Sequence, residues 1–335
     1  MTKGSTLGED GSNLSKISPK GEYSSLRWSP DGKKLSCVKK TGKQEQPCIF
    51  SIGISGAVLV KSEAYVNSIP SWSPDSKTII FSCNEKDISY SENDPPSSIC
   101  TYDIYTKRLN VIAKPPKLGL LAPIFISVNE IAYVDDCSSA IIFRDLITNK
   151  CRKIKVVEGD ISMDFEALEM IPFADSMVVV AAAEQGTGLN PPVPLTPGKP
   201  SWFPRMLKRL HKSLGKLTLY ATELTPCADS KSAYLVLNNE SDLSGDVVPQ
   251  SRAYKIDPQG SHLLFAVIGN YWISHVSPIG GNRFIYTRLT AGYDSEQGDL
   301  RIYDVNKKSS KLFREGVTQY AIWPRLQYGG EMLRR

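Results

Sequence analysis

Trp28-Ser29-Pro30-Asp31-Gly32-Lys33-Lys34 leads into the apolar run Leu35-Ser36-Cys37-Val38, and the same chemistry returns at Trp72-Ser73-Pro74-Asp75-Ser76-Lys77-Thr78 before Ile79-Ile80-Phe81. Proline sets one backbone angle of a tight turn, the aspartate can bond to its own backbone, and glycine tolerates a positive φ. Alternating β-forming residues follow each turn. The stretch therefore predicts a strand, a tight turn and a second strand, repeated along the chain.

The repeat continues in weaker form along the rest of the sequence. Positions equivalent to the two tryptophans are Ile126, Ile171, Pro226, Val276 and Trp323. Their spacing of about 44 to 55 residues is typical of propeller repeats. We therefore expect an all-β fold, a β-propeller of four-stranded blades, with six blades favoured and seven as the alternative. The segment 319–323 is expected to close the ring by pairing near the N-terminal segment.

The expected organisation is one large domain with short ends. Residues 1–20 are predicted to form a flexible lead, 21–326 a single β-propeller domain, and 327–335 a C-terminal tail. An insertion at 185–216 interrupts blade 4. Its first half, 190–197, is rich in proline and predicts an extended spacer.

Composition sets bounds on the class of protein. The chain has 335 residues and a formal net charge of +5, which is too small to imply nucleic-acid binding. Its seven cysteines are odd in number and lack metal or redox spacing, which argues against a disulfide framework and for a reducing compartment. We expect a monomer that is cytoplasmic on the sequence as given, or periplasmic if a signal peptide has been removed.

The motif Trp-Ser-Pro-Asp-Gly/Ser-Lys, an apolar strand and a later aromatic-x-Asp turn together resemble the WD40-like (PD40-type) propeller repeats of the TolB family. The resemblance covers roughly residues 22–325. It implies a bacterial β-propeller that works as a scaffold by binding other proteins. The matching motifs are structural turns, so no partner-binding residue carries over.

The second half of the insertion is the main charge asymmetry of the chain. Phe203, Leu207, Leu210 and Leu214 recur at helical spacing and predict an apolar stripe. The candidate binding residues lie around it: Trp202, Arg205, Lys208, Arg209 and Lys212. Three interpretations stay open for this basic amphipathic helix: a lid on the protein's own propeller, a ligand for a groove of an acidic partner, and a peripheral contact with an anionic membrane.

The connections between the second and third strands of the blades are expected to be long and to share one face of the propeller. They lie at 39–47, 84–98, 184–216, 238–251 and 289–298. Long loops on a rigid scaffold commonly carry recognition, so this long-loop face is the predicted binding face. The sequence predicts a non-catalytic protein-binding propeller with no cofactor and no metal. The alternative is a propeller hydrolase or lyase with a metal in the central channel.

Overall fold

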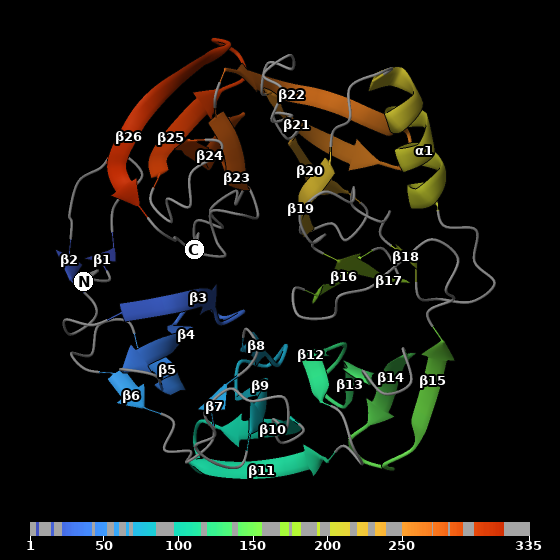
Figure 1. The fold of residues 1–335 in the computed structure, drawn as a ribbon. Coiled ribbons are helices and arrows are strands. Elements are labelled where there is room, and N and C mark those ends of the chain that lie inside the picture. Colours follow the sequence, from blue (N-terminus) through green and yellow to red (C-terminus); the bar gives the residue numbers. More distant parts are fainter. Residues whose placement is uncertain are drawn as a thin grey trace, which may run out of the picture. The chain divides into compact units, whose positions relative to one another are not determined.

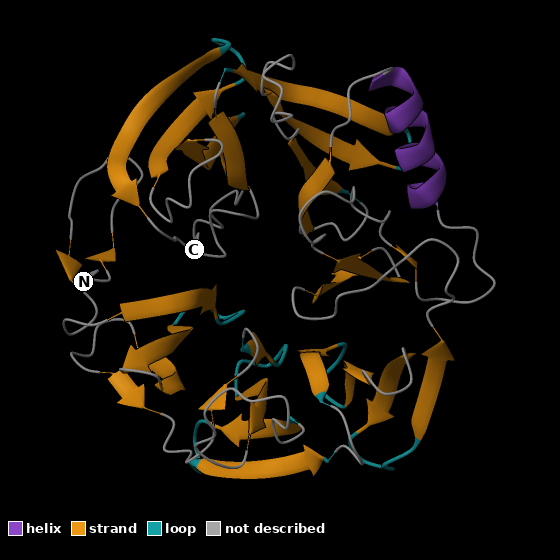
Figure 2. Cartoon of the chain, viewed as in Figure 1, coloured by secondary structure: helices purple, strands orange, loops and turns teal. Residues whose placement is uncertain are grey.

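In the computed structural model, the described residues form β-strands, a helix and short connections. The described residues are 5–6, 15–16, 22–41, 44–51, 57–59, 65–66, 70–84, 97–114, 119–135, 140–155, 168–173, 176–181, 193–194, 202–214, 220–226, 232–238, 250–269, 271–280, 282–290 and 298–317. They fall into two compact units, Met1–Glu158 and Gly159–Arg335. Each unit is described by itself below (Figures 1 and 2).

In unit 1 (Met1–Glu158), the described residues form a two-stranded sheet and three larger antiparallel sheets. The small sheet is β1 (Ser5–Thr6) with β2 (Ser15–Lys16). The second runs in the order β3 (Glu22–Trp28), β4 (Lys34–Thr41), β5 (Gln44–Ser51), β6 (Ala57–Leu59). The third contains β7 (Tyr65–Val66), β8 (Ser71–Trp72), β9 (Thr78–Asn84), β10 (Ser98–Asp103) and β11 (Arg108–Ala113). The fourth is β12 (Leu120–Phe125), β13 (Glu130–Asp135), β14 (Ala140–Asp145) and β15 (Cys151–Lys155).

Unit 2 (Gly159–Arg335) contains three further antiparallel sheets and a helix. The first sheet is β16 (Leu168–Phe173), β17 (Ser176–Ala181) and β18 (Val193–Pro194), after which α1 spans Trp202–Leu214. The next is β19 (Tyr220–Pro226), β20 (Ala233–Asn238), β21 (Gln250–Asp257) and β22 (Gly260–Ile268). The last is β23 (Tyr271–Gly280), β24 (Arg283–Thr290), β25 (Gly298–Asp304) and β26 (Ser309–Val317).

The Trp-Ser-Pro-Asp motif forms the predicted turns between first and second strands. In the second copy, Ser73 Oγ donates to Asp75 Oδ1 at 2.7 Å and accepts a hydrogen bond from the Thr78 N–H at 2.9 Å. Ser76 completes the turn with a φ of 61°, the conformation that a glycine adopts most easily. Side chain and backbone thus specify the turn together, and the β-hairpin follows from it.

A second kind of turn joins the third and fourth strands and begins with an aspartate. Asp103 Oδ1 accepts hydrogen bonds from the backbone N–H groups of Tyr105 at 2.9 Å and Thr106 at 2.7 Å. The aspartates at Asp145, Asp257 and Asp304 make the same pair of bonds in their own sheets. The Tyr-Asp-x-x-Thr-Lys pattern is therefore a turn signal of the Asx type.

Apolar clusters fill the space between neighbouring sheets within each unit. In unit 1, Trp72 is 8% exposed and packs with Val38 and Ile49 of the preceding sheet. A second cluster joins Ile80 and Ile99 to Phe125 of the following sheet. In unit 2, an equivalent cluster includes Val236, Phe265, Val276 and Tyr286. Trp72 and Val276, which precede the turns of their sheets, thus contribute to the seams between sheets, as the motif predicts for Trp72.

The prediction of six or seven blades with four strands each is wrong, because the described strands form sheets of three, four and five strands. Residues 185–216 also do not form the predicted helical insertion within blade 4. β18 lies in this range and pairs with β17, and α1, in the same range, leads from this sheet to β19 of the next. The proline-rich spacer supplies an edge strand, a position that tolerates proline because half of its N–H groups need no ladder partner. The predicted closing segment 319–323 lies outside the described residues.

The cysteines also depart from expectation. The cysteine count argued against a disulfide framework, yet Cys83 and Cys100, on the paired strands β9 and β10, form a disulfide. Cys37 and Cys48 face each other on β4 and β5 as buried free thiols. An odd number of cysteines therefore says little about a single pair, because strand register decides which two sulfurs meet. Among the described helices, none is long and apolar enough to cross a membrane.

Candidate functional site

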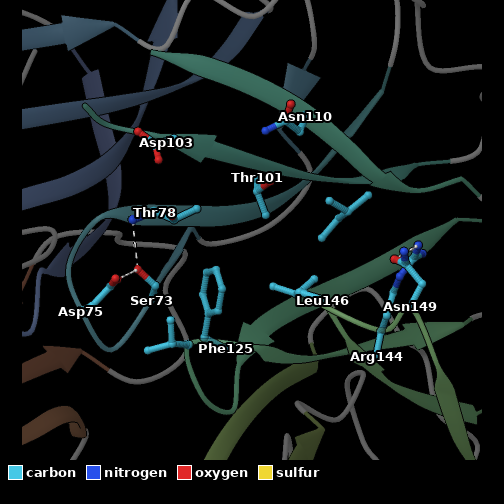
Figure 3. A pocket seen from close by; sticks show the side chains of 12 residues that line it. Ser73, Asp75, Thr78, Thr101, Asp103, Asn110, Phe125, Arg144, Leu146 and Asn149 are labelled. Atoms are coloured by element: carbon cyan, nitrogen blue, oxygen red, sulfur yellow. Dashed lines mark hydrogen bonds between the residues drawn. The ribbon is translucent and has the colours of Figure 1, made fainter. Parts of the chain in front are cut away.

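A pocket of about 270 Å³ lies in unit 1 between the sheet of β7–β11 and the sheet of β12–β15 (Figure 3). Its walls come from the turns that follow first and third strands, and from the adjoining ends of β9, β10, β11, β12 and β14. These turns are held by their own hydrogen bonds, so the pocket has a rigid frame.

The floor of the pocket is apolar. Phe125, Ile112 and Leu146 line it, and all three also belong to the apolar cluster between the two sheets. In Figure 3 the Phe125 ring and Leu146 lie between the polar groups at either end. The Leu146 N–H donates to the Asn129 carbonyl at 2.7 Å, which ties the turn of one hairpin to the turn of the next. The pocket is therefore the open end of the seam between two sheets.

Two carboxylates line one end of the pocket. Burial raises the pKa of the Asp75 carboxyl, but the hydrogen bonds from Ser73 Oγ and the Lys77 N–H and the nearby Lys77 ammonium hold this pKa below its ordinary value. The Thr106 N–H is the largest cause of the lowered pKa of Asp103, which the burial of its carboxyl and the Asp75 charge oppose only in part. Both side chains are therefore anionic at neutral pH.

The other end of the pocket carries a cation. Arg144 on β14 donates through Nη2 to Asn149 Oδ1 at 3.0 Å, and both side chains line the pocket. The buried Arg144 Nε makes no hydrogen bond within the described part of the chain. Figure 3 shows Arg144 and Asn149 side by side, at the end away from Ser73 and Asp75. The pocket is thus polarised, with acceptors at one end, donors at the other and an apolar floor between them.

Of the residues predicted as binding residues from sequence, all five fall in α1 of unit 2. Arg205, Arg209 and Lys212 are exposed, whereas the side chains of Trp202 and Lys208 lie outside the described part. The opposite side of α1 buries Met206, Leu210 and Leu214 to 6%, 3% and 8% exposure. The helix contacts β18 and β22 of the same unit. These contacts fit the interpretation of α1 as an element docked on its own scaffold, and external binding by its cations stays a prediction.

Sequence reasoning placed the binding face on the long connections, and most of these lie outside the described residues. The connection predicted at 39–47 is wrong, because β4 and β5 pair as far as Thr41 and Gln44. The pocket instead belongs to the tight-turn face, meaning the face formed by the turns after first and third strands. The sequence does contain a signal for this pocket, since alternating strands bring Asp75 and Asp103 to the same face. The prediction did not use it, because each of these aspartates is explained by its own turn.

Comparison with known proteins gives the fold and no more. No family model and no curated protein matches the chain. Among solved structures, the β-propeller domain of Cps50 (Swd1) from Myceliophteria thermophila is similar at 12% identity and a TM-score of 0.52, over 89% of this chain and 88% of that one. The acylaminoacyl peptidase of Pyrococcus horikoshii is similar at 12% identity and a TM-score of 0.53, over 91% of this chain.

TolB from Acinetobacter baumannii is also among the similar structures, at 14% identity and a TM-score of 0.46 over 93% of this chain. This chain spans 60% of that TolB structure and 46% of the peptidase. The class that the likeness to the Cps50 domain defines is the β-propeller, in agreement with the repeated antiparallel sheets and their turns. Propellers of this general kind include binding proteins and domains of enzymes, so function has to be argued from the site.

Proposed function

We propose that this protein is a non-catalytic, protein-binding β-propeller of the TolB-like or WD40-like kind, and that it holds a segment of its partner in the pocket between β7–β11 and β12–β15. The observation that carries the proposal is the pocket itself, an apolar floor with opposite charges at its two ends. A rigid scaffold that presents a concave, polarised site among turns is a common arrangement for recognition.

The size of the pocket favours a side chain over a whole small molecule. Its volume of about 270 Å³ falls below the roughly 300 to 1,000 Å³ of typical small-molecule sites. One or two side chains of a partner segment would occupy it. The rest of the segment would then lie across the exposed turns around it, such as that of Val128, which is 48% exposed.

The polar groups of the pocket suit binding better than proton transfer. The Ser73 hydroxyl both donates to Asp75 and accepts from the Thr78 N–H, so its position is set by the turn. Asp75 and Asp103 have lowered pKa values and would carry protons poorly near neutral pH. Fixed, ionised acceptors of this kind orient a ligand and attract its charge.

A random peptide-display selection tests the proposal and does not require the natural partner to be identified. Peptides selected on the full chain should bind it in solution, and Val128→Trp should weaken them at least about tenfold, because the indole would fill the mouth of a pocket that Val128 lines. Ile147→Trp is the matched control, since Ile147 is 70% exposed and its side chain does not line the pocket, although its turn does. Equal binding by the parent and both variants would overturn the assignment of this pocket.

A further inference from the structure

Both carboxylates at the acidic end of the pocket keep acceptor capacity beyond what their turns use. Asp103 Oδ1 accepts from two backbone N–H groups, and the Thr106 side chain also bonds to this carboxylate. Asp75 Oδ1 accepts from Ser73 Oγ at 2.7 Å and the Lys77 N–H at 3.2 Å. Asp75 Oδ2 lies 3.7 Å from the ammonium of Lys77, on a side chain that is 60% exposed. Because an ionised carboxylate offers about four acceptor positions, each of the two can accept a further hydrogen bond at the pocket.

A hydroxyl group, that of Thr101, also lines the pocket, and the residue is only 8% exposed. Thr101 precedes Asp103 by two residues on β10 and pairs with Asn110, so the three side chains share one face of the sheet. Figure 3 shows Thr101 on the side of β10 that faces Phe125. The Thr101 hydroxyl can therefore donate to, or accept from, a group bound in the pocket.

The apolar floor and the Arg144 end of the pocket restrict the chemistry of the group that can bind there. Phe125 and Leu146 offer an apolar surface on which the methylene stem of a long basic side chain can lie, with its charged head beyond. The Phe125 ring could add an attraction for the cation. At the far end, the Arg144 guanidinium repels a cation and can donate to a carbonyl or carboxylate. The complementary ligand is dipolar, with a cation at one end and an acceptor at the other.

Building on the function proposed above, we infer that the pocket takes an arginine or lysine side chain of the partner segment. The cationic head lies at Asp75 and Asp103 and bonds to the Thr101 hydroxyl, and the stem covers Phe125 and Leu146. The backbone carbonyl of the same segment accepts from Arg144. The partner is therefore a protein segment with an accessible basic residue, not an acidic one.

Small probes test this directly by NMR titration of the full chain. N-acetyl-arginine methylamide is compared with N-acetyl-citrulline methylamide, which has nearly the same shape without the charge. The arginine probe is expected to bind and the citrulline probe to bind at least about tenfold more weakly, because hydrogen bonds to charged groups are the stronger ones. Added salt should weaken only the arginine probe.

Two variants and a control locate the binding. Asp103→Asn keeps an oxygen for the turn but removes the charge, and it should weaken the arginine probe roughly tenfold. Thr101→Val should weaken it about threefold, as expected for the loss of one neutral hydrogen bond. Asp304→Asn is the matched control, because Asp304 Oδ1 accepts the same two turn bonds, from Asn306 and Lys307 at 3.0 Å each, and it lies outside the pocket. This control should leave the affinity unchanged.

The outcomes separate this inference from the proposed function. Equal binding of the arginine and citrulline probes, no binding of either, or an equal effect of Asp103→Asn and Asp304→Asn would overturn the inference. If display-selected peptides still required the pocket but lacked basic residues, the binding function would stand and only the ligand assignment would fail. If Val128→Trp had no effect on any peptide, the pocket itself would be excluded.

Discussion

The two copies of the Trp-Ser-Pro-Asp motif, residues 28–34 and 72–78, have the same turn and different surroundings. Ser29 Oγ donates to Asp31 Oδ1 at 2.6 Å and accepts from the Lys34 N–H at 2.9 Å. The second copy makes the same two bonds at 2.7 and 2.9 Å. The turn is therefore a local property of the motif, as expected when the bonding groups lie within six residues of one another.

What differs is what each copy contacts. Trp28 is half-buried, whereas Trp72 is 8% exposed and donates from Nε1 to the Arg27 carbonyl of the preceding sheet at 3.1 Å. Asp75 lines the pocket, and Asp31 does not. The two turns have the same local structure, but the neighbouring sheets give them different contacts. The repeat motif alone does not predict these contacts.

The largest expected effect comes from the two tryptophans. Trp72→Ala should lower the free energy of unfolding by about 3 to 5 kcal/mol, because it empties the seam next to Val38 and Ile49 and removes one of the donors to the Arg27 carbonyl. Trp28→Ala should lower it by less, since that side chain is partly exposed. Urea unfolding followed by circular dichroism measures both. Equal losses would show that the motif position alone decides burial and would break the comparison.

The next effect tests the turn that the copies share. Ser73→Ala should cost about 1 to 3 kcal/mol at pH 7, because the Thr78 N–H loses its acceptor and the Asp75 carboxylate loses a donor. The pKa of Asp75 is lowered in the folded protein, so its contribution is present above the ordinary pKa and lost as the pH falls through the folded value.

Part of the cost of Ser73→Ala should therefore disappear at low pH. Urea unfolding of parent and variant at pH 7 and at about pH 3 should show a smaller difference at the lower pH, and the remainder reports the Thr78 bond. Ser29→Ala is the control in the first copy and should behave alike, because the pKa of Asp31 is also lowered, with burial opposing the hydrogen bond from Ser29. A difference that grows on acidification would contradict the assignment of Ser73 as a donor to an ionised Asp75.

The sequence predicted the parts of the fold that depend on neighbouring residues in the chain. The Ser73–Asp75 turn, the Asp103 turn and the alternating strands follow from side chains only a few residues apart, and the β-propeller class follows from their repetition. The strand count of each sheet did not follow, because Val193–Pro194 becomes a strand only through its pairing with β17. The pocket did not follow for a similar reason, since it needs Asp75, Thr101 and Arg144 from different hairpins to meet.

The smallest expected effect on the free energy of unfolding comes from the fourth residue of each turn, where the two copies differ. Gly32 and Ser76 both have positive φ angles, of 68° and 61°. Gly32→Ala should cost about 1 kcal/mol, because an L-residue with a Cβ is destabilised by roughly that much in the left-handed region. The reverse change, Ser76→Gly, would relieve the same cost but add flexibility to the unfolded chain. It would also remove the Ser76 hydroxyl, which accepts from the Asp31 N–H at 3.0 Å and links the two turns.

These opposing terms are each about 1 kcal/mol, so Ser76→Gly should leave the free energy of unfolding unchanged or lower it by less than about 1 kcal/mol. Urea unfolding of Gly32→Ala, Ser76→Gly and the double variant decides the matter. If the Asp31–Ser76 bond couples the copies, the two changes should fail to add, because Gly32 follows the residue whose N–H donates to Ser76. A clear stabilisation by Ser76→Gly together with strict additivity would mean that the two turns are independent, and that their contact contributes nothing to holding neighbouring sheets in register.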